Sequence, residues 1–335
     1  MYTQIGDVVN IIFDRGIHLP DFDLWLDSRK KRSYGYISHA HQDHFAPHLN
    51  PLMTPHTFNL VRDQLPHSNP RLLDFGEPLE TSRYSLSLHP AGHCLGSAQV
   101  LIKSKLTGQS ILYTGDIKTR YNPTCQPIQP VPCDILVIES TFGSPMFRFP
   151  DQKDVLQQLL QTIKRWLNLH ITPVVLAYKT GKAQEILHHL QNNNLDVVLE
   201  PSIYEITRRY EESGIKFPRP FRQFDGSVDP GKILIIPPGK KSKEILKVVP
   251  NKRTIAMSGW AAHSSTRNRV GANVALPYSD HADFDDLLSY VKTVNPKKVY
   301  TVHGFSDLAR ELRKLGYEAN TLVDSTSALL QLSLL

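Results

Sequence analysis

The segment Tyr36-Ile37-Ser38-His39-Ala40-His41-Gln42-Asp43-His44 has the most specific pattern in this 335-residue chain. Two apolar residues lead into three histidines and one aspartate, whose side chains are preferred ligands of zinc, manganese and iron. We expect a strand that ends just before His39, with the ligands on the loop beyond it. His39 and His41 then converge on one ion, while Asp43 and His44 turn towards a second. A histidine-rich surface loop is the plainer alternative, but H-x-H-x-D-H is a specific spacing.

Two later segments offer further ligands for the same ions. His93 lies in Pro90-Ala91-Gly92-His93-Cys94-Leu95-Gly96, where small neighbours allow the backbone to approach an ion closely. Asp116 comes after an expected strand, 111–114, and is well placed to bridge two ions. The alternative for Asp116 is a turn aspartate that caps the next segment. After the first motif, His93 is the natural third imidazole of one metal.

Composition and charge give weaker information. Lysine and arginine (38) outnumber aspartate and glutamate (32), so the formal net charge is +6 and the sequence pI is about 9.1. Hydrophobic residues (40%) and charged residues (21%) are in the ordinary range for a globular protein. The basic balance favours a polyanionic partner, although it is also compatible with a merely soluble surface. The run Arg29-Lys30-Lys31-Arg32 is either a solvated hairpin turn or a phosphate-contacting lip near the site.

Cysteine usage and the terminal residues indicate the compartment. Cys94, Cys125 and Cys133 form no C-x-x-C pair, which argues against a disulfide framework and a cysteine-type zinc site. Residues 1–7 lack the basic start and apolar core of a signal peptide. No apolar run approaches the ~20 residues that a membrane span needs. We therefore expect a cytoplasmic protein with no membrane association.

The pattern changes after residue 143. An amphipathic helix is expected at 151–167, and a buried strand at 173–177 leads into Thr180-Gly181-Lys182, a glycine turn before a helix whose free amides attract anions. Strands and helices then alternate, which predicts a compact α/β unit over residues 144–270. Lys182, with Arg267 and Arg269 of a later loop, is a candidate phosphate contact. A solvated basic residue is the alternative at each position.

Two histidines follow this unit. His281 lies in Pro277-Tyr278-Ser279-Asp280-His281-Ala282-Asp283-Phe284, and His303 lies at the end of an expected strand in Thr301-Val302-His303-Gly304. Upstream, Glu139 ends the apolar strand Asp134-Ile135-Leu136-Val137-Ile138 in the same manner.

With these motifs together, the chain resembles the metallo-β-lactamase superfamily and, within it, the β-CASP nucleases. The segment G-K-A-Q-E at 181–185 also looks like the inserted β-CASP subdomain. The resemblance covers nearly the whole chain, and it is carried by His39, His41, Asp43, His44, His93, Asp116, Glu139, His281 and His303.

Within that family, the short length and the segments P-Y-S-D-H-A-D-F and T-V-H-G-F look most like the bacterial ligase-associated DNA exonucleases. Members of that group are typically encoded near an ATP-dependent DNA ligase and a helicase. One departure concerns His303, because crosslink-repair and Artemis-type DNA nucleases tend to have valine at that position. The resemblance implies a metal-dependent DNA exonuclease in DNA repair, acting on DNA strands with free ends, with an RNA-processing ribonuclease as the alternative.

The resemblance also implies a fold and a set of roles. The fold is α/β: a four-layer αββα sandwich formed by residues 1–143 and 271–335, interrupted by a β-CASP domain at 144–270, with the site in the cleft between them. Two divalent ions are expected, Zn²⁺ in the first place and Mn²⁺ as the alternative. The first ion is assigned to His39, His41 and His93, the second to Asp43, His44 and His303, with Asp116 bridging. Catalytic roles go to Asp43, Glu139 and His281, where Glu139 orients His281 and His281 protonates the leaving oxygen.

Two other classes of protein share this fold. A small-molecule metallohydrolase would act on thioesters, lactones or β-lactams, but such substrates need no second domain over the cleft. A catalytically inactive scaffold subunit would have lost metal ligands, and none of the expected ligands is missing from this sequence.

Overall fold

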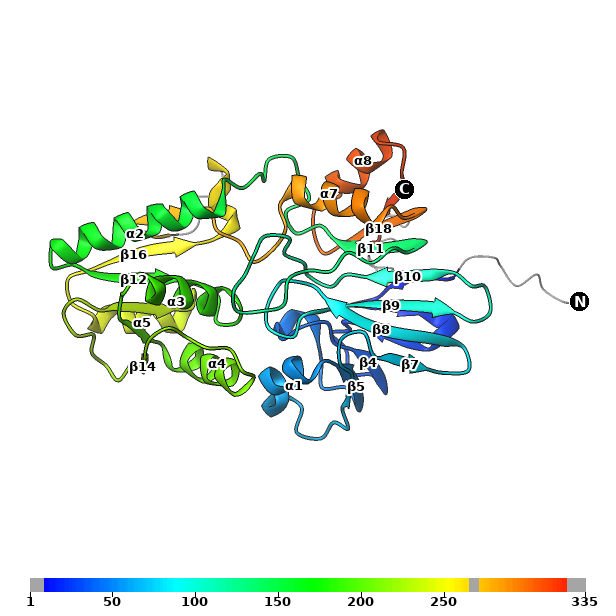
Figure 1. Cartoon of the computed structure of the whole chain (residues 1–335), viewed down its shortest axis with the longest axis horizontal. Helices are drawn as coiled ribbons and strands as arrows, with labels where there is room; N and C mark the ends of the chain where they lie inside the picture. The colour runs from blue at the N-terminus through cyan, green and yellow to red at the C-terminus, as the bar shows by residue number, and fades with distance from the viewer. Residues whose placement is uncertain (1–8, 265–270, 324–335) are drawn as a thin grey trace, which may run out of the picture. The chain divides into compact units, whose positions relative to one another are not determined.

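The computed structural model describes residues 9–264 and 271–323 and divides into two compact units (Figure 1). The inserted unit returns to the first unit at Phe284 rather than near residue 271, because β17 (Val274–Leu276) pairs with β16 (Lys252–Met257) of the inserted sheet. A short excursion, Arg120–Cys125, also belongs to the inserted unit. Unit one comprises Met1–Thr119, Gln126–Pro145 and Phe284–Leu335, and unit two comprises Arg120–Cys125 and Met146–Asp283.

The first sheet of unit one follows the order of the chain. Its first three strands are antiparallel, and the later ones are parallel, so the chain crosses over between them. The strands are β1 (Ile12–Phe13), β2 (Ile17–Leu19), β3 (Leu24–Leu26), β4 (Tyr34–Tyr36), β5 (Asn50–Met53) and β6 (Arg71–Leu72).

The second sheet of unit one is mixed, in the order β19-β18-β11-β10-β9-β8-β7. Strands β9 and β10 form an antiparallel hairpin, and β10, β11, β18 and β19 run parallel. The strands are β7 (Pro78–Glu80), β8 (Tyr84–Pro90), β9 (Ala98–Ser104), β10 (Ser110–Tyr113), β11 (Ile135–Glu139), β18 (Lys298–Val302) and β19 (Glu318–Thr321).

The core of unit one lies between its two sheets. Leu26 and Tyr36 of the first sheet share one buried cluster with Leu88, Val100 and Val137 of the second. In Figure 1, α7 (Phe284–Val294) and α8 (Asp307–Lys314) cover the second sheet beside β18, and α1 (Pro55–Val61) adjoins β5. The predicted four-layer αββα sandwich is therefore confirmed.

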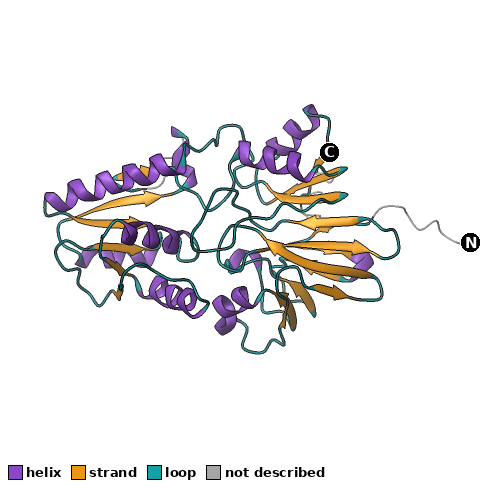
Figure 2. Ribbon diagram, viewed as in Figure 1, coloured by secondary structure: helices purple, strands orange, loops and turns teal. Residues whose placement is uncertain are grey.

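Unit two is built on a fully parallel sheet, in the order β14-β13-β15-β12-β16-β17. Its central strands are buried on both faces, as parallel sheets require (Figure 2). Helices α2 (Gln152–Asn168), α3 (Lys182–Asn192) and α4 (Pro201–Glu212) pack on one face, and α5 (Lys240–Val248) packs on the other. The remaining strands are β12 (Thr172–Leu176), β13 (Val197–Leu199), β14 (Arg222–Gln223) and β15 (Ile233–Ile236).

Helix starts follow their capping residues. Thr54 caps α1 by accepting from the Thr57 N–H at 3.1 Å, with Pro55 in the first turn, and Asp151 caps α2 by accepting from the Lys153 N–H at 2.7 Å. Helix α1 ends at Val61, and a 3₁₀ turn continues it. None of the described helices is long and apolar enough to cross a membrane. The 3₁₀ helices are η1 (Pro20–Phe22), η2 (Gln42–His44), η3 (Arg62–Gln64) and η4 (Gly259–Ala262).

Candidate metal centre

The candidate ligands of unit one stand at or just beyond the ends of its strands. His39 follows β4, His93 follows β8 and Asp116 follows β10, while His303 follows β18. Strands β8, β10, β11 and β18 all run in the same direction, so their carboxyl ends meet at one edge of the sheet. The fold therefore brings together side chains that are far apart in the sequence.

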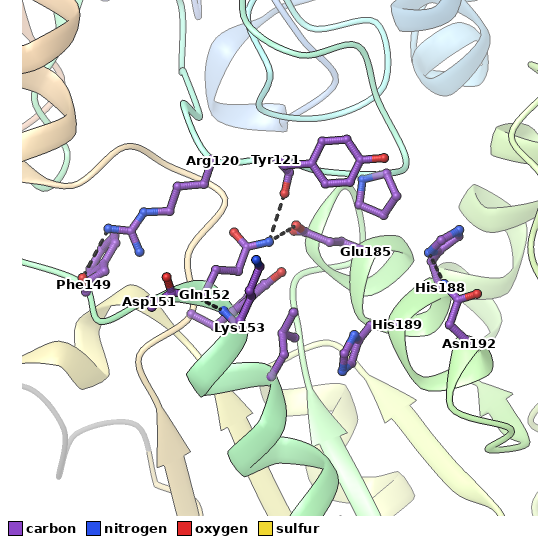
Figure 3. A pocket seen from close by; sticks show the side chains of 13 residues that line it. Arg120, Tyr121, Phe149, Asp151, Gln152, Lys153, Glu185, His188, His189 and Asn192 are labelled. Atoms are coloured by element: carbon purple, nitrogen blue, oxygen red, sulfur yellow. Dashed lines mark hydrogen bonds between the residues drawn. The ribbon is translucent and has the colours of Figure 1, made fainter.

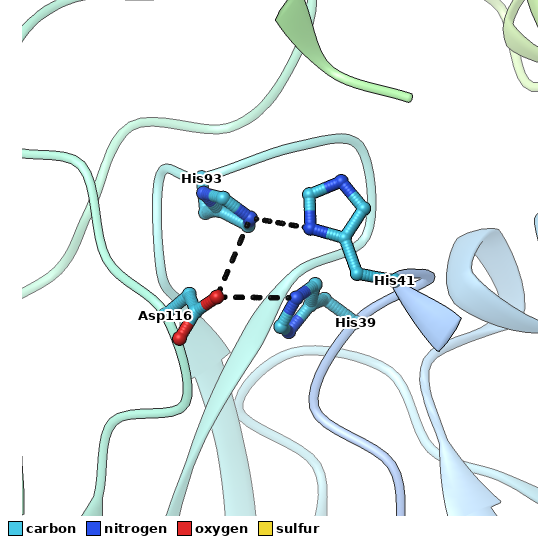
Figure 4. A group of neighbouring side chains, drawn as sticks. All are labelled: His39, His41, His93 and Asp116. Atoms are coloured by element: carbon cyan, nitrogen blue, oxygen red, sulfur yellow. Dashed lines mark hydrogen bonds and ion pairs between the residues drawn. The ribbon is translucent and has the colours of Figure 1, made fainter. Parts of the chain in front are cut away.

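Four of these side chains form a compact group (Figure 4). Ligand atoms of His39, His41, His93 and Asp116 all lie within 4.8 Å of one another. The His93 Nε2 to His41 Nδ1 distance is 3.0 Å, and Asp116 Oδ2 lies 3.5 Å from His39 Nε2 and 3.9 Å from His93 Nε2. Zinc–ligand bonds of ~2.0 Å in a tetrahedron would separate their ligand atoms by about 3.3 Å. Three imidazoles and a carboxylate at this spacing fit one divalent ion.

Asp116 also faces a second histidine. Its Oδ2 atom lies 3.3 Å from His44 Nε2, and the His303 ring centroid lies 5.1 Å from that of His44. One carboxylate thus stands between the first group and the pair His44 and His303. This is the position that a bridging ligand needs.

A buried carboxylate that the sequence analysis missed supports this arrangement. Asp27 Oδ2 lies 2.9 Å from His44 Nδ1 and accepts from Tyr113 Oη at 2.8 Å and Ser38 Oγ at 2.5 Å. Ser38 Oγ in turn lies 2.8 Å from His39 Nδ1. A ligating histidine is normally held through its second ring nitrogen in this way. Asp27 and Ser38 therefore set the orientation of two predicted ligands.

The electrostatics of the group favour a positive charge. Burial alone lowers the pKa of His44, but Asp116, Asp27 and Asp43 outweigh burial and raise the pKa to about 10. Burial and the charge on His44 lower the pKa of His303 to about 4, although Asp27 and Glu139 act in the opposite direction. Buried carboxylates that stabilise a positive charge on a neighbouring imidazole so strongly also suit a metal cation.

Backbone features fix two of the ligand loops. Gly115, next to Asp116, has φ +56°, and a Cβ there would lie 2.6 Å from the Ser38 side chain. His303 has φ +58°, an uncommon conformation for a non-glycine residue that is found at functional sites. A Cβ on Gly304 would lie 1.8 Å from the Ser140 carbonyl oxygen, so only glycine fits beside His303.

The three predicted catalytic residues lie in different surroundings. Glu139 is buried, and its Oε1 accepts from the Ile117 N–H at 2.7 Å, which holds the loop that carries Asp116. Asp43 is exposed in η2, and it is not in the groups of potential metal ligands that the described residues form. His281 is half-buried in unit two, where its backbone N–H donates to Ser279 Oγ at 3.0 Å.

The predicted phosphate contact at Lys182 needs a correction. The side chain is 2% exposed, and Nζ lies 2.9 Å from Asp280 Oδ1 and 4.6 Å from the Tyr178 ring centroid. A buried, ion-paired ammonium group does not present its charge to a substrate, so its position gives that prediction no support. Arg267 and Arg269 lie outside the described residues.

A separate cavity of about 760 Å³ lies within unit two, lined by residues of α2 and α3 (Figure 3). Gln152 Nε2 donates to Glu185 Oε1 at 3.3 Å and to the Tyr121 carbonyl at 2.9 Å. Arg120 pairs with Asp283 at 2.7 Å. These polar groups satisfy one another, and the described residues lining the cavity form no group of metal ligands.

The chain is similar to proteins named as a DNA ligase, a ribonuclease and an exonuclease, and part of it matches a family of metal-dependent hydrolases. Residues 269–323, which include His303, match the family described as "Zn-dependent metallo-hydrolase RNA specificity domain". A protein of Opitutus terrae named "Probable DNA ligase" is 37% identical over 313 residues, which are 92% of this chain and 31% of the relative. The chain thus spans about a third of that relative's length.

Two shorter relatives are named as nucleases. The "RNase J-like protein" of Methanocaldococcus jannaschii is 24% identical, over 80% of each chain. The "5' exonuclease Apollo" of Gallus gallus is 25% identical, over 80% of this chain and 58% of the relative.

Proposed function

Because the chain belongs to the β-CASP family of the metallo-β-lactamase superfamily, we propose that it is a DNA exonuclease that removes nucleotides stepwise from strand ends. At the coarser level it is a β-CASP metallo-nuclease that acts on nucleic acids. The observation that carries the proposal is the shared carboxylate, because Asp116 faces the His39, His41 and His93 group and also His44.

Two divalent ions are proposed for this centre, Zn²⁺ or Mn²⁺. His39, His41, His93 and Asp116 would hold the first, while Asp116, His44 and His303 would hold the second, with Asp43 as a further proposed ligand. When bound, such ions neutralise charge on phosphate oxygens and lower the pKa of water enough for hydrolysis near neutral pH. The structure supports these proposed ligands of the second ion unequally. His44 and Asp116 are buried and in contact, whereas Asp43 is exposed.

The protein's own residues position the ligands. Asp27 accepts a hydrogen bond from His44 Nδ1, and the other ring nitrogen, Nε2, then faces Asp116. Glu139 holds the backbone of Ile117 and thereby the neighbouring Asp116. Both carboxylates act through other residues: Asp27 through His44, and Glu139 through the backbone next to Asp116.

We assign leaving-group protonation to His281, with Glu139 as its orienting partner. An imidazole with an ordinary pKa near 6.5 exchanges protons near neutral pH, as a general acid must. His281→Ala is expected to lower turnover by about 10²–10⁴-fold while metal content stays near that of the wild type. Loss of a metal ion in His281→Ala but not in His303→Ala would mean that the two roles are exchanged.

The name of one relative favours DNA as the substrate, and the name of another favours exonuclease action at the 5′ end. The Opitutus terrae relative is named a probable DNA ligase, and the Gallus gallus relative is named a 5′ exonuclease. By analogy we propose the 5′ end as the starting point and single strands as the preferred form. We also propose a role in DNA repair, in the same pathway as an ATP-dependent DNA ligase and a helicase. The proposed location is the cytoplasm. Arg267 and Arg269 remain proposed phosphate contacts.

RNA processing is the second candidate function. The match over residues 269–323 is to a domain described by RNA specificity, and the Methanocaldococcus jannaschii relative is named RNase J-like. His303 falls within that match and is the residue at which the sequence resembles the RNA-processing branch. The metal chemistry is the same for both substrates, so only the substrate distinguishes the candidates.

The test is digestion of end-labelled single- and double-stranded DNA and RNA of matched sequence, with Zn²⁺ and with Mn²⁺. The proposal predicts a ladder of stepwise products from DNA and no cutting of covalently closed circular single-stranded DNA. Efficient cutting of the circle would contradict the exonuclease. Faster digestion of the matched RNA would assign the protein to RNA processing.

A further inference from the structure

A basic turn, Arg29-Lys30-Lys31-Arg32, begins beside the metal centre. Arg29 is two residues after Asp27, so the two Cα atoms are at most about 7 Å apart. A second turn packs against it: the Arg29 N–H donates to the Arg15 carbonyl at 2.8 Å. A Cβ on Gly16 would lie 2.5 Å from Ser28 Cα, so the two turns touch. Both turns belong to unit one, as do the metal ligands.

The second turn also lies next to a predicted ligand. Phe13 immediately precedes the turn, and its ring centroid lies 5.7 Å from that of His303 in an edge-on arrangement. Basic side chains therefore flank the His303 side of the centre.

Three cations of these turns are available to a ligand. Asp14 pairs with Lys30 at 3.2 Å and with Arg32 at 3.5 Å. Among the described residues, Asp14 is the acidic partner in every ion pair of the two turns. The remaining cations are exposed and form no ion pair with any described side chain. They are Arg15, Arg29 and Lys31.

The turn that carries two of these cations is held rigidly. The Arg32 guanidinium lies 3.2 Å over the Trp25 ring, and Trp25 stacks on His18 with a centroid distance of 4.1 Å. Arg32 Nε donates to Ser28 Oγ at 3.1 Å, and the Arg32 N–H donates to His48 Nδ1 at 3.1 Å. A turn fixed at both ends loses little entropy when it binds a ligand.

We propose that Arg15, Arg29 and Lys31 bind the phosphodiester backbone of the substrate strand beside the phosphate that is hydrolysed. This inference rests on the proposed nuclease function and adds the residues that hold the strand outside the metal centre. Arginine binds phosphate oxygens with two parallel hydrogen bonds, and lysine acts as a point charge. Such contacts read backbone charge rather than bases, so the surface suits a substrate of any sequence.

The test compares Arg29→Ala/Lys31→Ala with a matched control, Arg83→Ala/Lys103→Ala. The control removes the same charges where Tyr84 pairs with Ser104, at the opposite end of β8 and β9 from the loop that carries His93. Binding of a fluorescent single-stranded oligonucleotide to metal-free protein is measured by anisotropy over a range of salt concentrations. Unfolding temperature and metal content establish that each variant is folded.

The turn variant is expected to raise Kd about 4- to 25-fold at low salt, since each of the two exposed charge contacts contributes about two- to fivefold. The slope of log K against log salt should become shallower by about 1.4, or about 0.7 for each phosphate that the variant no longer neutralises. The control should match the wild type. If alanine lowers the unfolding temperature, Arg29→Gln/Lys31→Gln keeps the aliphatic stems and serves in its place.

Unchanged affinity and slope in the folded turn variant would overturn the inference. An equal loss in the control would also overturn it, because a general charge effect would then explain the result. Metal-dependent hydrolysis by the wild type, measured separately on bis(4-nitrophenyl) phosphate and on oligonucleotides, tests the proposed function itself. A wild type that binds the strand through this turn but hydrolyses neither substrate would refute the nuclease and leave the binding surface standing.

Discussion

The two units of this protein bury charged side chains in opposite ways. In unit one, the buried carboxylates of Asp27 and Asp116 stand among imidazoles, and the pKa of His44 is raised to about 10, so the group attracts positive charge. In unit two, Lys182 and Asp280 are equally buried but neutralise each other at 2.9 Å. A buried group with surplus negative charge suits a cation, whereas a balanced pair is a structural element. The net charge of a buried group, more than its depth, distinguishes a metal centre from a structural pair.

The largest effect that this comparison predicts is at Asp116. Asp116→Asn keeps the shape of the side chain but removes the charge shared by both ligand groups. Nuclease activity should fall by about 10³-fold or more, since metal stabilisation of charge contributes several kcal/mol, and bound metal should fall with it. Metal analysis and turnover on labelled oligonucleotides check this. Wild-type metal content together with wild-type turnover would show that Asp116 is not the shared ligand.

The balanced pair should respond in stability instead. Lys182→Met leaves the Asp280 carboxylate buried without its ion-pair partner, which should lower the free energy of unfolding by about 3–5 kcal/mol. Metal content should stay at the wild-type level, because the ligands belong to unit one. Denaturant unfolding and metal analysis measure the two quantities. The double variant Lys182→Met/Asp280→Asn removes both charges and should recover part of the loss; if it is no more stable than the single variant, the pair is not the cause.

A smaller effect is expected at the carboxylate behind His44. Asp27→Asn loses the charged acceptor for His44 Nδ1, and removal of such a supporting partner typically weakens metal affinity or activity about 10- to 100-fold. Titration of the metal-free protein with Zn²⁺ checks the affinity. The matched control is Asp23→Asn, which changes an exposed aspartate on the neighbouring turn. Equal affinity in both variants would remove Asp27 from the centre.

These residues also show what the sequence can predict. The ligands of the first motif can be predicted because His39, His41 and His44 stand close together in the sequence. Their spacing is specific enough to be recognised from the sequence alone. Glu139 and His303 are predicted as site residues by the resemblance to the β-CASP nucleases. The same resemblance predicts the αββα sandwich, the alternation of strands and helices predicts the inserted α/β unit, and the structure confirms that fold.

Asp27 and Lys182 show the limit. Asp27 follows a three-residue strand and has no histidine beside it in the sequence, so nothing local distinguishes it from a turn aspartate; only the fold brings it to His44. Lys182 follows a glycine at the start of a helix, which locally predicts an anion site. Asp280, which is distant in the sequence, neutralises it. In both cases an interaction between distant segments decides the role.

The last variant concerns His48, a buried histidine of unit one that is not among the proposed metal ligands. Burial lowers the pKa of His48 to about 4, because its charged form has no carboxylate as close as those of His44. The His48 side chain of the unfolded chain takes up a proton below about pH 6.5, whereas that of the folded protein does so only near pH 4. The contribution of His48 to the free energy of unfolding is therefore complete above about pH 6.5 and is lost as the pH falls from about 6.5 to about 4. His48→Asn should remove this fall in the free energy of unfolding, which is on the order of 2–3 kcal/mol because one pKa unit corresponds to about 1.4 kcal/mol.

Urea unfolding of metal-free wild type and His48→Asn at several values between pH 7 and pH 4 measures this difference. Asparagine keeps an acceptor for the Arg32 N–H that His48 Nδ1 accepts in the wild type. Parallel stability profiles for the two proteins would mean that His48 is not the source of the pH dependence.

The most direct test of the central claim is stepwise reconstitution of the wild-type protein. Metal is removed by exhaustive chelation, Zn²⁺ or Mn²⁺ is returned in known amounts, and bound metal and hydrolysis of an end-labelled DNA strand are measured on the same samples. We predict no hydrolysis without metal, and activity that rises with the ions bound at the group around Asp116. Full activity in the metal-free protein would contradict the account.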